Sequence, residues 1–333
     1  MGKRALVIGI DQYRNVSSLA GCVNDATQVT EAISKHEDGS PNFSTKLYTA
    51  PSAPGSTHPP ITTVLVQQEC RRLFAGEPND EVIFYFSGHG VTSDYGGAFV
   101  TTEGTREAPG FDMYKLLLLA QKSACRSIVL IADCCYSGQL GNDPALTNLN
   151  EPAPQRSQLR EGIVVMSASR PNEVSMEIAG QGVFTGLLLS GLQGAAADLR
   201  GCVSAGSLYS FVENALGAWD QRPLLKMNVR ETGILRRCKP RFADEDLRAL
   251  PRYFGSKFDK LRLDPSYEQS QAAAKPENVS TVRYLKRAQL AGLVNAEPEH
   301  TDLYWTAINS GHVKLTLLGQ YYWYLAERGL IGA

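Results

Sequence analysis

The sequence lacks three features that would each indicate a class of function. It has no apolar run long enough to span a bilayer, and the short apolar run after residues 1–4 ends at Asp11, so we expect neither a membrane span nor a signal peptide. Its 7 cysteines are dispersed and contain no CxxC pair, which argues against a disulfide framework and a zinc site. With 33 Lys and Arg against 34 Asp and Glu, no net charge favours nucleic acid or anionic lipid. We therefore expect a cytoplasmic protein that binds neither nucleic acid nor membrane.

Two apolar runs that end in short polar motifs are the most informative features present. Residues 82–86 precede Ser87-Gly88-His89-Gly90, and residues 128–132 precede a motif that contains Cys135. Such runs of branched and aromatic residues predict buried strands of a parallel sheet, and ligands collect beyond the carboxyl ends of these strands. The sequence therefore predicts a histidine and a cysteine at one edge of a sheet, which is typical of a cysteine hydrolase.

The remaining pattern predicts an α/β fold with two domains. Strand and helix signals alternate up to about residue 230, residues 92–110 look irregular, and residues 139–161 predict a long loop behind Cys135. Composition changes after Cys238, so we place a domain boundary between 1–238 and 239–333. In the second part, a helix near 282–291, a hairpin of 303–308 with 313–316 and a helix at 317–328 predict a small, mainly helical, winged-helix-like domain.

The chemistry of a cysteine and histidine pair assigns further roles. A thiolate attacks a carbonyl carbon, and a nearby imidazole takes the thiol proton and later protonates the leaving amine. We expect the backbone N–H groups of Cys135 and Gly90 to stabilise the oxyanion, because glycine allows a close approach of backbone to substrate. Adjacent residues that leave a strand point to opposite sides, so Cys134 is expected to pack in the core.

These motifs resemble those of the caspase-like peptidases of clan CD, and especially the metacaspase and bacterial caspase-like branch. The resemblance extends over roughly residues 3–230 and includes residues 19–26, 167–170 with Glu173, and 182–185. The separation of 46 residues between His89 and Cys135 is close to the value of about 50 in caspases. The resemblance implies a three-layer sandwich with a six-stranded, mostly parallel sheet, His89 as base and Cys135 as nucleophile. Tyr136 departs from the family pattern, which often has histidine there.

The resemblance also implies a pocket for arginine or lysine, lined by Asp25, Asp133, Ser87 and Cys22. Two carboxylates attract a guanidinium and can bind it in bidentate geometry, whereas an aspartate side chain would be repelled. We expect arginine to be preferred over lysine. Two simpler roles stay open: Asp25 could cap the first helix, and Asp133 could orient the backbone near Cys135.

We therefore predict a cysteine endopeptidase that cuts proteins after arginine or lysine. It is expected to cleave itself after Arg156 or Arg160 and to be controlled by a protein partner through its C-terminal domain. No cofactor or metal ligand set is expected, and a calcium requirement stays open because some metacaspases depend on calcium. The alternative is a catalytically silent caspase-fold scaffold. DNA binding is disfavoured, since residues 240–333 hold 12 Lys and Arg against 11 Asp and Glu.

Overall fold

The computed structural model describes residues 2–51, 59–93, 96–135, 140, 159–168, 177–178, 181–216, 223–299 and 302–332. The chain divides into an N-terminal unit, residues 1–197 and 202–239, and a C-terminal unit, residues 198–201 and 240–333. The short segment 198–201 is fixed within the C-terminal unit by polar contacts. The Arg200 guanidinium donates to the carboxylate of Asp244 at 2.8 and 2.7 Å, and the N–H of Phe242 donates to the carbonyl of Leu199 at 3.2 Å. The chain therefore crosses between the two units three times.

A six-stranded sheet forms the centre of the N-terminal unit, in the order β12-β8-β7-β3-β1-β2. Its strands are β1 (Lys3–Ile10), β2 (Ser44–Ala50), β3 (Glu81–Ser87), β7 (Ser127–Asp133), β8 (Ile163–Ser167) and β12 (Leu224–Asn228). The first five run parallel, and β12 pairs antiparallel with β8. This confirms the predicted α/β fold with a mostly parallel sheet. All seven residues of β3 are buried, as the continuous apolar run indicates.

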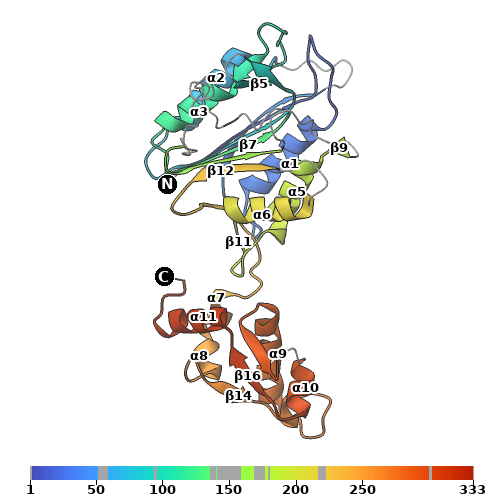
Figure 1. The fold of residues 1–333 in the computed structure, drawn as a ribbon, viewed down its shortest axis with the longest axis vertical. Helices are drawn as coiled ribbons and strands as arrows, with labels where there is room; N and C mark the ends of the chain where they lie inside the picture. The colour runs from blue at the N-terminus through green and yellow to red at the C-terminus, as the bar shows by residue number, and fades with distance from the viewer. Residues whose placement is uncertain are drawn as a thin grey trace, which may run out of the picture. The chain divides into compact units, whose positions relative to one another are not determined.

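Helices cover both faces of this sheet and make three layers. On one face lie α2 (Thr63–Phe74) and α3 (Met113–Lys122), and on the other lie α1 (Cys22–Ser34), α5 (Val183–Ser190) and α6 (Ala205–Leu216) (Figure 1). Alternate side chains of β3 enter different layers, because successive residues of a strand point to opposite faces. Phe84 and Phe86 pack in the α2/α3 core, whereas Ile83 and Tyr85 pack in the core with α1, α5 and α6.

A small antiparallel sheet occupies the segment that looked irregular in the sequence. It consists of β4 (Gly90–Ser93), β5 (Gly96–Val100) and β6 (Gly110–Asp112), so the expectation of irregular structure over 92–110 is wrong for the strand residues, whereas residues 101–109 contain no helix or strand. Buried Phe99 and Phe111 lie opposite each other in the β5/β6 pair and hold it against the core. Because β4 starts at Gly90, this sheet fixes the backbone that follows His89.

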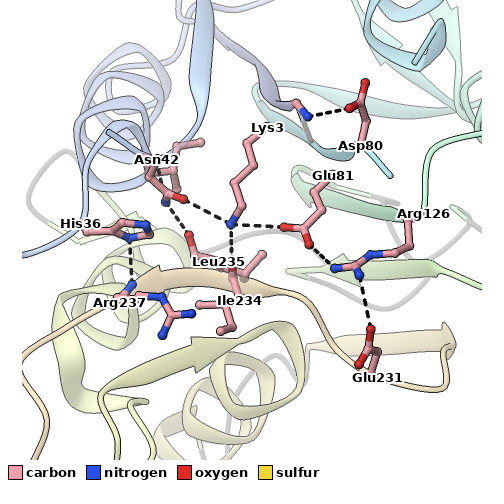
Figure 2. A network of polar contacts seen from close by, with 12 residues as sticks. Lys3, His36, Asn42, Asp80, Glu81, Arg126, Glu231, Ile234, Leu235 and Arg237 are labelled. Atoms are coloured by element: carbon pink, nitrogen blue, oxygen red, sulfur yellow. Dashed lines mark hydrogen bonds and ion pairs between the residues drawn. The ribbon is translucent and has the colours of Figure 1, made fainter. Parts of the chain in front are cut away.

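The amino ends of the strands carry a network of ion pairs (Figure 2). Glu81, the first residue of β3, pairs with Lys3 at 3.2 Å and with Arg126 at 2.7 Å, and Arg126 also reaches Glu231 at 3.6 Å. A cavity of about 510 Å³ lies beside this network, lined in part by Arg126, Arg160 and Arg230. These guanidinium groups bond to carboxylates or carbonyls of the chain itself, so the network joins strands at the edge of the sheet remote from the predicted site.

The C-terminal unit combines short helices with a three-stranded antiparallel sheet in the order β14-β16-β15. Its elements are α7 (Asp244–Arg248), α8 (Leu250–Tyr253), β14 (Lys260–Arg262), α9 (Pro276–Leu290), β15 (Val294–Glu297), α10 (Leu303–Ile308), β16 (His312–Leu315) and α11 (Leu317–Glu327). Fully buried Leu285, Leu293 and Val313 are in its core. The indole N–H of Trp323 donates to the carbonyl of Phe254 at 2.7 Å and ties α11 to the end of α8.

One predicted strand of this unit is a helix. Residues 303–308 form α10, and the partners of β16 are β14 and β15, so the predicted hairpin of 303–308 with 313–316 is wrong. The Asp302 side chain accepts the N–H of Tyr304 at 2.7 Å and caps the helix. Leu303, Thr306 and Ala307 are buried at helical spacing. The helices expected near 282–291 and 317–328 are present as α9 and α11, and the winged-helix-like assignment stays a prediction.

Candidate active site

The segments that carry His89 and Cys135 lie side by side at the carboxyl ends of β3 and β7. In this parallel pair Ser87 lies opposite Asp133, and the N–H of Gly88 donates to the carbonyl of Asp133 at 3.3 Å. His89 and Cys135 each follow these paired residues by two positions, so the two strands deliver them at the same level. Gly90 lies against Cys135 so closely that an added Cβ would overlap the carbonyl oxygen of Cys135.

The His89 imidazole has a defined hydrogen-bond partner. Its Nε2 lies 2.8 Å from the carbonyl oxygen of Ser17, and this oxygen can only accept, so we assign the proton to Nε2. In the neutral ring, Nδ1 is then the proton acceptor. Among the described residues no hydrogen bond joins the imidazole to the Cys135 thiol. Catalytic bonds of this kind are often long without substrate and shorten in the complex.

Tyr13 contacts both the backbone and the ring of His89, a role that the sequence did not suggest. The phenol oxygen accepts the backbone N–H of His89 at 2.8 Å, and the two rings lie 4.9 Å apart between centroids. Burial raises the pKa of Tyr13 well above its ordinary value, so the phenol stays neutral. Tyr13 and Ser17 both belong to the segment between β1 and α1, and they bond to the backbone and to the ring of His89 respectively.

The two adjacent cysteines have different surroundings. Cys134 is 1% exposed and belongs to the hydrophobic core on the α2/α3 face, whereas Cys135 is partly exposed. A nucleophile needs access to its substrate. The different burial supports the choice of Cys135 over Cys134.

The four predicted pocket residues meet beside this site. Cys22 is buried, and its thiol lies near the side chains of Ser87, Asp133 and Asp25. Burial, together with the charges of these aspartates and of Asp11, raises the pKa of the Cys22 thiol far above its usual range. Cys22 therefore stays a neutral thiol, which does not suit it to be a second nucleophile.

Asp11 is a further carboxylate that the sequence did not reveal as part of this region. Its Oδ1 accepts the N–H groups of Cys22 and Val23 at 2.8 and 3.4 Å, at the start of α1. Burial raises the pKa of Asp11, while these two N–H groups act in the opposite direction. Asp11 thus holds the first turn of α1, and Asp25 is available for another role.

The carboxylates of Asp25 and Asp133 face the first turn of α5. The N–H of Gly182 donates to Oδ2 of Asp25 at 3.2 Å, and the hydroxyl of Thr185 donates to Oδ2 of Asp133 at 2.6 Å. A Cβ on Gly182 would lie 2.6 Å from the Asp133 oxygen and 3.2 Å from the Asp25 oxygen, so only glycine fits there. Asp25 and Asp133 are only 2% and 6% exposed, and the positive end of α5 favours negative charge beside it.

The two predicted processing sites differ in what the structure describes. Arg156 lies outside the described residues. The guanidinium of Arg160 donates to the carbonyl oxygens of Cys125, Glu161 and Ala120 at 2.7, 2.6 and 3.2 Å. Cleavage after Arg160 would require these three bonds to break.

Neither a membrane-spanning helix nor a cluster of metal-ligating side chains occurs in the described ranges. No helix there combines the length and the apolar character needed to cross a membrane. Nor does that part of the chain bring together three or more His, Cys, Asp or Glu residues that could hold a metal ion.

The six-stranded sheet and the paired strand ends that carry His89 and Cys135 are the features of a caspase-like fold. The profile of the caspase domain matches residues 2–232, and the chain belongs to this family.

Curated relatives agree with this assignment. Metacaspase-2 of Trypanosoma brucei brucei is 27% identical over 222 residues, which cover 60% of this chain and 63% of that protein. A probable protease of a Desulfuromonadales bacterium is 26% identical over 338 residues, which cover 90% of this chain and 39% of that protein. The chain thus spans less than two thirds of the length of these relatives. The crystal structure of protein GSU0716 from Geobacter sulfurreducens aligns with a TM-score of 0.49 and 16% identity, over 72% of this chain and 98% of that chain.

Proposed function

We propose that this protein is a cysteine endopeptidase that cleaves proteins after arginine, and less readily after lysine. The observation that carries the proposal is the contact between the Gly90 and Cys135 segments, next to the buried pair Asp25 and Asp133. A nucleophile, a base and an anionic pocket then lie at one edge of the sheet.

In the proposed mechanism, Nδ1 of His89 takes the proton of the Cys135 thiol, and the thiolate attacks the carbonyl carbon of the scissile bond. The N–H groups of Gly90 and Cys135 stabilise the oxyanion. The protonated imidazole then gives its proton to the leaving amine, which breaks the C–N bond and leaves a thioester on Cys135. Water activated by His89 hydrolyses this thioester and restores the thiol.

The acidic pair explains the proposed preference for arginine. A guanidinium can donate to both carboxylates in planar geometry, whereas an ammonium is a point charge that uses this geometry less well. Because the carboxylates are only 2% and 6% exposed, a substrate side chain must displace the N–H of Gly182 from Asp25. We therefore propose that residues 181–182 move when the pocket opens.

Reporter peptides with Arg, Lys or Asp at the cleavage position test the substrate class. The wild type should cleave Arg best, Lys less and Asp hardly at all, with calcium or with a chelator tested in parallel. Cys135→Ala should abolish cleavage, whereas the matched control Cys134→Ala should keep the preference, since Cys134 is a core residue. A preference for Asp, or activity that survives Cys135→Ala, would refute the proposal. Complete inactivity of a folded wild type would favour the scaffold alternative.

Control of the enzyme is the second part of the proposal. Self-cleavage is proposed after Arg156 first, because Arg160 is held by three carbonyl oxygens. A fragment that begins at Ser157 and is absent from Cys135→Ala would support this order. A fragment that begins at Glu161, or a single uncut chain with full activity, would contradict it.

The C-terminal unit is the proposed site for a regulatory protein partner in a reducing cytoplasm. Exposed apolar side chains on α11 support this role: Leu317 is 85% exposed, and Tyr321 is 58% exposed. Limited proteolysis of α11 with and without a purified candidate partner tests the idea. Protection of α11 that is lost in Leu317→Glu is expected.

A further inference from the structure

A chain of two buried hydroxyl groups ends on one carboxylate of the acidic pair. Tyr85 of β3 and Thr185 of α5 are both 0% exposed, and their hydroxyl oxygens lie 2.6 Å apart. The Thr185 hydroxyl also lies 2.6 Å from Oδ2 of Asp133 at the end of β7. Three elements of the sandwich, β3, α5 and β7, therefore meet in one hydrogen-bonded line.

Each hydroxyl group of this hydrogen-bonded line has a single proton, and this fixes which group donates to which. The Thr185 hydroxyl donates to Oδ2 of Asp133, and this bond uses the single hydroxyl proton of Thr185. The Thr185 oxygen must then accept the proton of Tyr85. Burial and the charges of Asp133 and Asp25 raise the pKa of Tyr85 well above its ordinary value, so Tyr85 stays a donor. Both hydroxyls therefore point toward the carboxylate.

If positions 185 and 85 served only to fill the core, they would need no hydroxyl groups. Valine and phenylalanine at positions 185 and 85 could occupy nearly the same space without burying hydroxyl groups that must find partners. Moreover, the same turn of α5 also supplies the Gly182 N–H to Asp25. Both carboxylates of the pair are thus held by donors from residues 182–185.

We propose that Thr185, supported by Tyr85, is a positioning residue that orients the Asp133 carboxylate and thereby sets the preference for a basic side chain in the substrate. This role rests on the proposed function. A hydrogen bond to a charged group is stronger than one between neutral groups, and neighbouring bonds in a chain reinforce one another. Thr185 at the start of α5 and Tyr85 of β3 therefore act together on the orientation of Asp133.

The test compares Thr185→Val, Thr185→Ser and Tyr85→Phe with the wild type on Arg and Lys reporters. Thr185→Val removes the donor at nearly constant volume and should lower kcat/KM for Arg about 10- to 100-fold, mainly through KM. Thr185→Ser keeps the hydroxyl and should keep most of the activity. Tyr85→Phe removes only the first link and should give an intermediate loss.

Two further readouts separate this role from simple loss of packing. Alkylation of Cys135 by iodoacetamide, followed by mass spectrometry, needs no basic side chain, so its rate should be the same in all variants. In Thr185→Val the acid limb of kcat/KM should move to higher pH, because a carboxylate that loses a donor binds a proton more readily. The serine variant should restore the position of this limb.

The possible results distinguish this proposal from the proposed function. If the wild type prefers Arg and Lys but Thr185→Val keeps the wild-type KM and acid limb, the positioning role is overturned and the proposed function stands. If Thr185→Ser loses as much as Thr185→Val, the effect is packing and the role is again overturned. If the wild type shows no preference for basic residues, the proposed function fails and the specificity role fails with it.

Discussion

Gly90, which follows His89, packs against the backbone of Cys135. We predict that Gly90→Ala separates these two segments and nearly stops catalysis. The backbone of Gly90 is outside the left-handed region, so alanine can adopt it without strain. Its Cβ, however, would overlap the carbonyl oxygen of Cys135 and lie 3.0 Å from Sγ of Cys134. The overlapped atom belongs to the main chain, so no side-chain rotation relieves the clash.

The expected size of the effect follows from this overlap. Normal contacts require the two segments to separate by about 1 Å, and a misplacement of about 1 Å costs roughly 100-fold in rate. Overpacking of a buried site costs about 1–3 kcal/mol of the free energy of unfolding. We therefore expect kcat/KM on the Arg reporter to fall about 100-fold in a protein that still folds.

The assay needs both kinetics and stability. We would measure kcat/KM and the unfolding free energy in urea for Gly90→Ala and for a matched control, Gly206→Ala. The control lies in α6, where the new Cβ would meet Cγ2 of Thr232 at an ordinary 3.7 Å. It should keep full activity and gain about 0.5–1 kcal/mol of stability, since alanine favours a helix over glycine.

Wild-type activity together with wild-type stability in Gly90→Ala would refute the reasoning, because the two segments could not then be in contact. A loss of stability with full activity would show that the two segments are in contact but that this contact does not contribute to catalysis.

Three further predictions concern single side chains. Tyr13→Phe leaves the N–H of His89 without its acceptor and should cost about 1–3 kcal/mol in urea unfolding, with a lower kcat; unchanged stability would contradict it. Burial lowers the pKa of Lys226 from 10.5 to about 8. The unfolded chain therefore binds more protons between these values, and the wild type should gain stability relative to Lys226→Met as the pH rises from about 8 to 10.5; parallel stability curves would count against it. Trp323→Phe loses the bond to the Phe254 carbonyl and should speed hydrogen exchange in α11, while unchanged exchange would show that the bond is dispensable.

Much of the central sheet could be predicted because its signals are local. The apolar runs that became β3 and β7 are continuous and end in turn-forming residues, and the edge at which parallel strands end is a rule of topology. The placement of His89 and Cys135 at one edge followed from these two facts. Their equal offset from the paired residues Ser87 and Asp133 depends on strand register, which only the structure gives.

The supports of the site could not be predicted, because they depend on distant segments. Ser17 and Tyr13 lie 72 and 76 residues before His89, and nothing in their local pattern links them to it. Thr185 belongs to a motif that carried the family resemblance, but its bond to Asp133 joins residues 52 positions apart. The hydrogen bonds from the first turn of α1 to Asp11 show the same limit, since Asp11 lies 11 residues before Cys22.

The wrong prediction for residues 303–308 has a local cause. Aromatic and β-branched residues such as Tyr304, Trp305 and Ile308 are common in strands, and this composition favours a strand. The spacing of the buried Leu303 and Ala307 is helical.

Segment 198–201 has a practical consequence for any dissection of this protein. A truncation at residue 239 would leave Arg200 without Asp244 and Leu199 without Phe242, so the shortened chain would still contain residues 198–201 of the C-terminal unit without their partners. Conversely, residues 240–333 expressed alone would lack part of their own fold. A faithful separation of the two halves must therefore graft these four residues onto the downstream fragment and bridge the gap they leave behind.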